Sequence, residues 1–193
     1  MQSMIKDIVT KSRSYRRFDE DFQVKEQTLV ELVELARLTP SGGNLQPLKY
    51  LLSATAEKND RIFPALKWAG YLKDWSGPDK GERPSAYIVI LGDKEITTNF
   101  GCDHGIVAQT MLLGAVEQGL GGCMIGAFNL EKLRTALGLP EQLEVLLVIA
   151  LGKPVEKVLI DPIDADGNIK YWRDENLVHH VPKRDLKDMI FPH

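Results

Sequence analysis

The chain has 193 residues, of which 44% are hydrophobic and 26% charged, and its formal net charge is −3. This length and composition predict a single globular domain over residues 1–193 and exclude a disordered chain, a collagen-like fibre and a coiled coil. The small negative charge provides no general basic field for nucleic acid or an anionic membrane, so any phosphate site must be local.

Cysteine usage and hydropathy indicate the compartment. Two cysteines, Cys102 and Cys123, cannot build a disulfide framework, and no CxxC motif occurs. No apolar run approaches the roughly 18 residues of a membrane-spanning helix. The N-terminal residues lack the apolar core of a signal peptide. We therefore expect a reduced, cytoplasmic protein that has neither a membrane nor a nucleic acid as partner.

The N-terminal part of the chain predicts two helices and a strand. Residues 3–12 and 26–38 are expected to be helical. The second helix has one buried stripe at helical spacing, formed by Leu29, Leu32, Val33 and Ala36. Residues 39–44 include a proline and two glycines and end this helix. Residues 50–54 are expected to form a short strand.

The next segment, residues 60–85, is expected to be irregular. It contains Trp68 and Trp75, followed by a loop rich in glycine, proline and charge at 77–84. Such a loop is usually a surface connection, and the two tryptophans leave a lid or a partner contact as the alternative. Residues 86–92 are nearly all apolar and predict a buried strand.

Residues 104–119 predict the most informative helix. Apolar side chains lie on almost every face, so this helix is expected to be buried nearly all round. A central helix of one domain can meet this condition, and an oligomer interface meets it more readily. Gly114, in the middle of the helix, costs roughly 1 kcal/mol relative to alanine, which suggests that another backbone approaches closely.

The remaining elements complete an α/β or α+β pattern. They are a glycine-rich turn, a strand, a helix and a second buried strand, at 119–122, 123–128, 130–137 and 143–151. The tail after Pro154 is polar, and it is expected to form a hairpin with Asp166-Gly167 as its turn.

Several common site motifs are absent from the sequence. There is no phosphate-loop, α/β-hydrolase or zincin motif. The run Gly119-Leu-Gly-Gly122 follows a helix, whereas a dinucleotide fingerprint follows a strand. We therefore interpret it as a helix C-cap and a turn, and we reject a Rossmann site.

A metal site is also not expected. The four histidines have no ligand spacing, and the adjacent His179 and His180 are expected to point apart on a strand. Residues 164–175 imitate a calcium loop, but Ile169 occupies the position that requires glycine. A turn explains this segment better than a calcium site.

Three polar segments remain as candidate sites. Residues 12–18 contain three arginines, whose forks match phosphate oxygens and planar carbonyl edges. Residues 40–47 combine glycines, which allow close backbone approach, with serine, asparagine and glutamine. Residues 181–184 end in the basic pair Lys183-Arg184. Each segment alone is more typical of a solvated surface or an ordinary turn.

Taken in order, these segments resemble the nitroreductase family of flavin enzymes. Ser-Arg-Ser-Tyr-Arg-Arg-Phe at 12–18 is similar to RRSxRxF, with Ser12 in place of the first arginine. Thr-Pro-Ser-Gly-Gly-Asn-Leu-Gln-Pro at 39–47 is similar to APSxxNxQPW, with Leu48 in place of tryptophan. The helix that ends in Gly-Leu-Gly-Gly, followed by Cys-Met-Ile-Gly-Ala-Phe, resembles AAQNLLLAAxxxGLGxxWIGxF. The resemblance extends from about residue 5 to residue 190.

The resemblance implies an α+β fold with a central, mainly antiparallel sheet flanked by helices. It also implies an intertwined homodimer with FMN at two sites built from both subunits. The residues it assigns to FMN binding are Arg13, Ser14, Arg16, Pro40, Ser41, Gly42, Asn44, Met124, Ile125, Gly126, Lys183 and Arg184.

The resemblance also implies a role for each group. Arg13 and Ser14 are expected to contact the phosphate and the ribityl chain of FMN. Lys183 and Arg184 are expected to close the phosphate site. Arg16 is expected to contact the pyrimidine edge of the flavin. The 40–44 residues line the ring, partly from the partner subunit, and the 124–126 residues run along the ring.

The implied activity is an FMN-dependent NAD(P)H oxidoreductase with a ping-pong mechanism. NADH or NADPH reduces FMN, and a small electron-poor acceptor such as a nitroaromatic or a quinone then takes the electrons. Because the flavin performs the hydride chemistry, no catalytic acid or base is assigned. The alternative is a flavin-binding carrier or redox sensor without turnover, and the missing fingerprint disfavours a flavin-free dehydrogenase. Residues 67–75 and 82–84 are expected to shape the acceptor pocket, with the dimer rim as the alternative.

Overall fold

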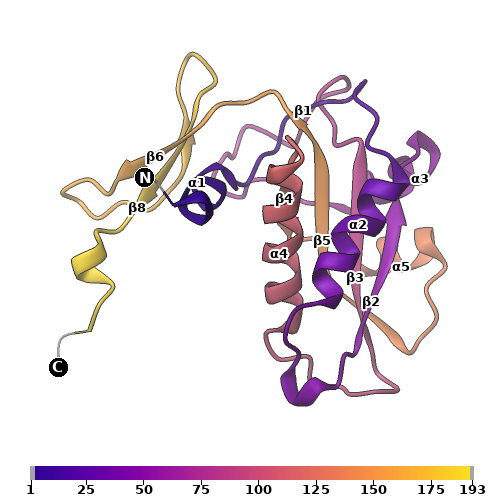
Figure 1. Cartoon of the computed structure of the whole chain (residues 1–193). Coiled ribbons are helices and arrows are strands. Elements are labelled where there is room, and N and C mark those ends of the chain that lie inside the picture. The colour runs from indigo at the N-terminus through magenta and orange to yellow at the C-terminus, as the bar shows by residue number, and fades with distance from the viewer. Residues whose placement is uncertain (1–2, 192–193) are drawn as a thin grey trace.

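The computed structural model, which describes residues 3–191, contains a five-stranded sheet with helices on both faces and a separate three-stranded sheet (Figure 1). The helices are α1 (Met4–Lys11), α2 (Glu26–Arg37), α3 (Ala56–Ile62), α4 (Asp103–Glu117) and α5 (Leu130–Leu137). The strands are β1 (Phe18–Asp19), β2 (Leu48–Ser53), β3 (Ala86–Asp93), β4 (Gly121–Ile125), β5 (Leu143–Pro154), β6 (Val158–Pro162), β7 (Trp172–Arg173) and β8 (His179–Lys183). Short 3-10 helices lie at Gly42–Asn44, Phe63–Ala65 and Leu186–Asp188.

Strand β5 lies at the centre of the larger sheet. It pairs with β3 along one edge and with β4 along the other, β2 continues beyond β3, and β1 pairs with its last residues. Every one of these pairings is antiparallel. The predicted α+β fold with a mainly antiparallel sheet is therefore confirmed.

Both faces of this sheet are covered. Successive side chains of a strand point to opposite faces, so Ile88 and Ile90 of β3 pack toward α2 and α4. Tyr87 and Val89 pack on the other face, in a cluster that includes Leu133 of α5. This double burial explains why β3 is an unbroken apolar run.

The helices of the structure agree with those predicted from the sequence, and one further helix, α3, was not predicted. α1, α2 and α5 agree with their predicted ranges to within a residue at each end. α3 is an additional helix, which begins after Thr55, whose side chain accepts a hydrogen bond from the Lys58 N–H at 3.4 Å. Trp68, in the irregular segment that follows, is buried against the second face of the sheet, so this tryptophan is part of the core.

Helix α4 is buried on one side only. Met111 and Ala115 face α2 and the sheet, whereas Gln109 is exposed and Leu113 is half-buried. The expectation of burial nearly all round is therefore wrong for a single chain. A Cβ atom on Gly114 would lie 2.4 Å from Leu35 Cδ1 of α2, so the close neighbour is a side chain rather than the predicted backbone.

The predicted hairpin after Pro154 is also wrong in its pairing. Strands β6 and β8 run parallel, and a parallel pair requires a crossover connection instead of a tight turn. Gly167 N–H does donate to the Asp164 carbonyl at 3.0 Å, but this turn lies within the crossover. The hairpin joins β7 to β8, and the Asp174 carboxylate accepts from Val178 N–H at 2.8 Å within its turn.

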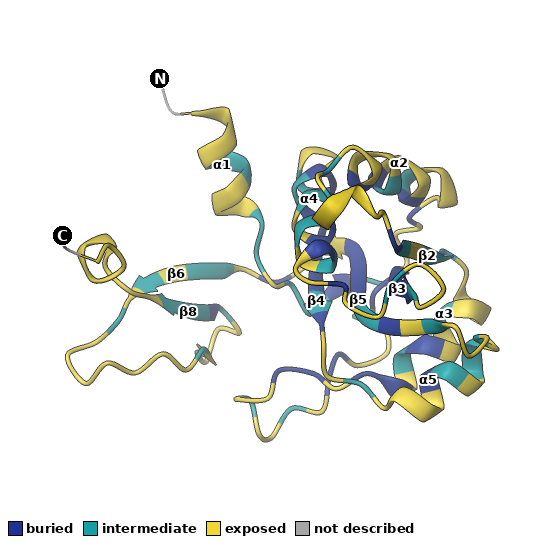
Figure 2. Ribbon diagram, turned by 90° about the horizontal axis from the view of Figure 1, so that it is seen from below, coloured by how far each residue is buried: buried dark blue, intermediate teal, exposed yellow. Residues whose placement is uncertain are grey.

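Two parts of the chain project from the main body. Figure 2 shows α1 and the β6–β8 sheet extending away from the larger sheet, with exposed residues along α1 and near the C-terminal end. Apolar side chains are among the exposed ones, including Met4 on α1 and Leu186 and Met189 after β8. Within residues 3–191, no helix has the length and apolar character needed to cross a bilayer.

Candidate functional site

One candidate site forms where the segment between α1 and β1 meets β4. Ser14 bridges to Gly122 in β4, and the Tyr15 N–H donates to the Gly122 carbonyl at 3.0 Å. This pairing fixes the predicted arginine-rich segment beside the strand. Arg16 then lines a cavity of about 130 Å³ together with residues 67–70 and 123–127. The structure thus brings four predicted site residues together: Arg16, Met124, Ile125 and Gly126.

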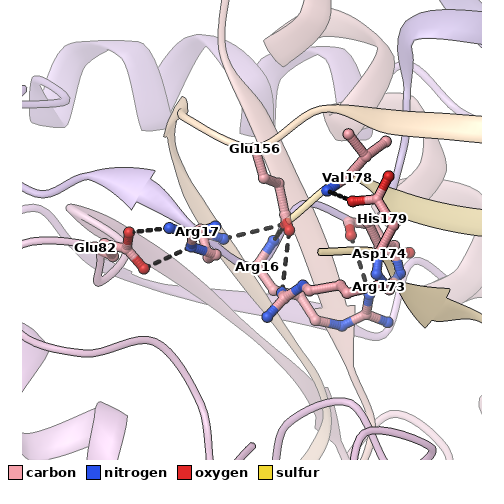
Figure 3. A network of polar contacts seen from close by, with 9 residues as sticks. Arg16, Arg17, Glu82, Glu156, Arg173, Asp174, Val178 and His179 are labelled. Carbon is pink, nitrogen blue, oxygen red and sulfur yellow. Dashed lines mark hydrogen bonds and ion pairs between the residues drawn. The ribbon is translucent and has the colours of Figure 1, made fainter. Parts of the chain in front are cut away.

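A buried carboxylate holds the backbone of this segment from the far end of the sequence. Figure 3 shows Glu156, which follows β5, reaching the main chain before β1. Its Oε1 accepts the backbone N–H groups of Arg16 and Arg17, the latter at 3.2 Å. Its Oε2 pairs with Arg173 Nη2 at 3.1 Å, and the Glu156 side chain is fully buried. One carboxylate therefore fixes two chain segments and neutralises a largely buried guanidinium.

The next residue, Arg17, forms an ion pair within the fold. Arg17 Nε donates to Glu82 Oε2 at 2.6 Å, and its Nη2 donates to the other oxygen of the same carboxylate (Figure 3). This hydrogen bond is the main cause that raises the pKa of Arg17 and lowers the pKa of Glu82. Arg17 thus links β1 to the loop before β3, and only Arg13 and Arg16 of the three arginines remain for a ligand.

The side chain of Arg16 contacts the smaller sheet. Its Nη1 lies 3.2 Å from His179 Nε2, and its guanidinium carbon lies 4.9 Å from the centre of the Tyr171 ring. His179 is 1% exposed. Burial, with the nearby charges of Arg16 and Arg173, lowers the pKa of His179 to about 4. A neutral imidazole therefore faces the guanidinium.

The adjacent histidine points the other way, which confirms the prediction for this pair. His180 stacks on Trp172 with ring centres 4.1 Å apart. Its Nδ1 lies 2.6 Å from Asp161 Oδ2, and this hydrogen bond raises the pKa of His180. Two histidines that are neighbours in sequence thus have opposite environments, because successive strand residues alternate in direction.

Arg13 lies at the end of α1. Its Nη2 donates to the Val9 carbonyl at 2.8 Å, and its Nε is buried without a hydrogen-bond partner among the described residues. A buried donor without a partner is costly, so an anionic group near this position would satisfy it.

The second predicted segment lies at a different place in the chain's fold. Ser41 Oγ donates to Asp103 Oδ2 at 2.6 Å, and the Gly42 N–H donates to Oδ1 at 3.0 Å. Gly43 and Asn44 follow with positive φ angles of 57° and 55°, a left-handed backbone that glycine and asparagine tolerate best. Asp103, the first residue of α4, thereby fixes the loop. Pro40 and Ser41 line a separate cavity of about 330 Å³ between α2, α4 and β2.

A single chain does not unite the predicted groups. Ser14 sits beside the start of β4, which follows the C-terminal end of α4, whereas Ser41 is bonded to the first residue of α4. The 15 residues of α4 span about 22 Å. Lys183 and Arg184 are exposed, at the opposite end of β8 from His179.

Sequence reasoning missed residues that position the predicted ones. They are Asp103, Glu156, Tyr171 and Arg173, together with the role of His179. A charged residue after an apolar strand, such as Glu156, gives no local signal because its backbone partners before β1 lie 140 and 139 positions away. The adjacent histidines did signal one inward and one outward side chain.

Comparisons with known proteins agree with this architecture. The chain is 27% identical over 165 residues to a protein of Archaeoglobus fulgidus provisionally named as an NADH dehydrogenase/NAD(P)H nitroreductase, covering 81% of this chain and 88% of the relative. Among solved structures, it is similar to an FMN-dependent nitroreductase of Clostridium difficile, with a TM-score of 0.62, 24% identity and coverage of 78% and 87% of the two chains.

A similar protein of Bacteroides thetaiotaomicron, also provisionally named as an NADH dehydrogenase/NAD(P)H nitroreductase, has a TM-score of 0.66 at 23% identity, with coverage of 80% and 89%. At these identities the solved structures establish the fold. The family model described as the Nitroreductase family matches residues 9–153, which is more than half of the chain. This match assigns the chain to the Nitroreductase family, and its antiparallel sheet agrees with the fold of the similar solved structures.

Proposed function

We propose that the chain, as one domain over residues 1–193, is an FMN-dependent NAD(P)H oxidoreductase that acts as a homodimer. In this proposal NADH or NADPH delivers electrons to FMN, and a small electron-poor acceptor, such as a nitroaromatic or a quinone, then receives them. The observation behind it is the cavity that joins Arg16 to Met124, Ile125 and Gly126 in a chain of this family.

The residues present fit FMN. The buried Nε of Arg13 has no partner among the described residues, as expected for a group that meets a phosphate oxygen. Arg16 offers a cation at the cavity beside β4, where it would meet the pyrimidine edge. FMN, when bound, supplies the hydride chemistry, so the chain contributes position, charge and restricted access. Arg16 would stabilise the negative charge of the reduced ring.

The dimer is part of the proposal because one chain offers only part of a cofactor site. A cavity of about 130 Å³ is smaller than the several hundred Å³ that cofactor pockets occupy. Residues 40–44, which would line the ring, and Lys183 with Arg184, which would meet the phosphate, lie elsewhere in the same chain. A second copy can bring them to the site that Arg13 and Arg16 begin. The half-buried stripe of α4 and the exposed apolar residues of α1 provide surfaces for it.

The test is an absorption spectrum of the purified protein with added FMN, followed by anaerobic NADH and then NADPH. A bound flavin band that bleaches supports the cofactor and identifies the donor. Steady NAD(P)H consumption with a quinone or a nitroaromatic then separates an enzyme from a carrier or sensor. Absence of a flavin band at saturating FMN would contradict the proposal.

A further inference from the structure

We propose that His179 is a positioning residue, whose neutral imidazole accepts a hydrogen bond from Arg16 and holds the guanidinium at the β4 cavity. His179 would thereby set the orientation of Arg16, which lines this cavity together with Met124–Gly126. Its consequence for the cofactor rests on the proposed FMN function, whereas the contact itself does not.

The geometry places Arg16 beside one partner from the smaller sheet and one from the residue just before β7. His179 of β8 meets Nη1 at 3.2 Å, and the Tyr171 ring lies under the guanidinium at 4.9 Å. The rings of Tyr171 and His179 are 5.2 Å apart, so they support each other. Nη1 also donates to the Ser14 carbonyl at 3.2 Å. The guanidinium is therefore held by the imidazole nitrogen of His179, the carbonyl of Ser14 and the face of the Tyr171 ring.

Within residues 3–191, no carboxylate forms an ion pair with this guanidinium. The fully buried Glu156 accepts from the backbone of Arg16, and its charge is paired with Arg173. Glu82 is paired with Arg17. The Arg16 guanidinium thus forms no ion pair among the described residues, which leaves it available to a ligand.

The contact determines which nitrogen of His179 is protonated. The arginine donates, so Nε2 must be unprotonated to accept, and the proton of the neutral ring must be on Nδ1, which is buried without a hydrogen-bond partner among the described residues. The groups around the His179 ring are Arg16, Arg173 and Tyr171, while His180 lies on the opposite face of β8 and adds only the smallest of the repulsions. None of these described groups is an anion. A charged imidazolium would repel two guanidinium groups and would lose its role as acceptor.

The first experiment tests the contact without any flavin. ¹⁵N NMR of the FMN-free protein with labelled histidine reports the protonation of both ring nitrogens, and His179→Gln assigns the signal. We expect Nδ1 protonated and Nε2 unprotonated from pH 8 down to pH 5.5. In Arg16→Met the constraint on Nε2 is removed, and the proton is expected to distribute over both nitrogens. A His179 ring that titrates near pH 6.5, or that protonates Nε2 in the wild-type protein, overturns the proposal.

The second experiment tests the consequence for the cofactor. The dissociation constant of FMN is measured for His179→Leu, which removes the acceptor, and for His179→Gln, whose amide oxygen replaces it. We expect about a tenfold weaker affinity in the first and less than about threefold in the second, as for the loss and rescue of one hydrogen bond to a charged group. His180→Leu, on the opposite face of β8, is the matched control and should bind FMN like the wild type.

A double-mutant cycle shows whether His179 acts through Arg16. If it does, His179→Leu adds nothing to the weakened FMN binding of Arg16→Met. Equal effects of His179→Leu with and without Arg16 would overturn the positioning role, as would failure of glutamine to rescue. The midpoint potential gives an independent readout, because a tenfold loss of preference for reduced over oxidised FMN lowers it by about 30 mV. If the wild type binds no FMN, the proposed function fails, and the NMR result still decides the contact.

Discussion

Asp103 and Ser41 form a 2.6 Å hydrogen bond that ties the loop after α2 to the first residue of α4. The same carboxylate accepts the Gly42 N–H, and Asp103 is only 6% exposed. This pair anchors the start of the loop in which Gly43 and Asn44 have a left-handed backbone, and this loop is proposed to meet the flavin ring of the partner subunit.

Replacing Asp103 by alanine should therefore destabilise the chain and disorder the loop. Loss of two hydrogen bonds to a buried carboxylate predicts a decrease of about 2 to 4 kcal/mol in the free energy of unfolding, measured by urea denaturation. Glu34→Ala, which breaks an exposed ion pair with Arg37, is the control and should leave the free energy of unfolding nearly unchanged. Equal small effects of both substitutions would show that the Asp103 bonds are not important.

The pair of Glu156 and Arg173 gives a second stability prediction. Glu156→Gln removes the charge that compensates a guanidinium whose side chain is 11% exposed, so unfolding should become easier by about 3 kcal/mol or more. The double variant Glu156→Gln/Arg173→Met removes both charges and should recover part of this loss. If the single and double variants have the same free energy of unfolding, the unpaired charge of Arg173 is not the cause of the destabilisation.

The two adjacent histidines predict opposite pH dependences of stability. The pKa of His179 is lowered from 6.5 to about 4, so the unfolded chain binds its proton first, and stability falls as pH decreases from 6.5 to 4, by up to about 3 kcal/mol. His179→Gln should make stability depend less on pH between pH 6.5 and 4. The pKa of His180 is raised by Asp161, so its contribution is complete below pH 6.5 and is lost as pH rises through the folded pKa.

His180→Gln is the matched variant for this measurement. It should leave the decrease in stability between pH 6.5 and 4 unchanged and remove the decrease in stability above pH 6.5. Urea denaturation of both variants between pH 4 and 8.5 gives the comparison, and a decrease between pH 6.5 and 4 that is the same in His179→Gln and the wild type would contradict the assignment.

Arg13 should contribute directly to FMN affinity under the proposed function. Arg13→Ala removes a guanidinium with a buried, unpartnered Nε, and loss of one charge-assisted hydrogen bond predicts about 10- to 150-fold weaker FMN binding, equivalent to roughly 1.5–3 kcal/mol. Arg61→Ala, in an exposed pair on α3, is the control for the loss of one positive charge. Fluorescence titration with FMN measures both, and unchanged affinity in Arg13→Ala would remove this residue from the site.

The half-buried face of α4 should be the surface that a second chain covers. Leu113→Asp places a charge on this face and should convert a dimer to a monomer in light scattering after gel filtration, with loss of FMN because the site is shared. Glu131→Lys on the exposed side of α5 is the control and should leave the mass unchanged. A wild-type protein that is monomeric at micromolar concentration would contradict the proposed dimer.

The sequence by itself determined the features that depend on near neighbours. The spacing of four residues predicted the buried stripe of α2: Leu29, Leu32, Val33 and Ala36. Val33 is half-buried and the other three are buried. The apolar runs predicted β3 and β5, and the period of two in a strand predicted that His179 and His180 point apart. Each of these follows from backbone periodicity, which acts within a few residues.

Only the tertiary structure decided which distant segments meet. It made β6 and β8 parallel where a hairpin was expected, and it brought Leu35 against Gly114. It also placed Glu156 beneath Arg16, and His179 beside its guanidinium. No local pattern encodes these contacts, because a buried charge or a neutral histidine is stable only where the whole fold supplies its partners and excludes water.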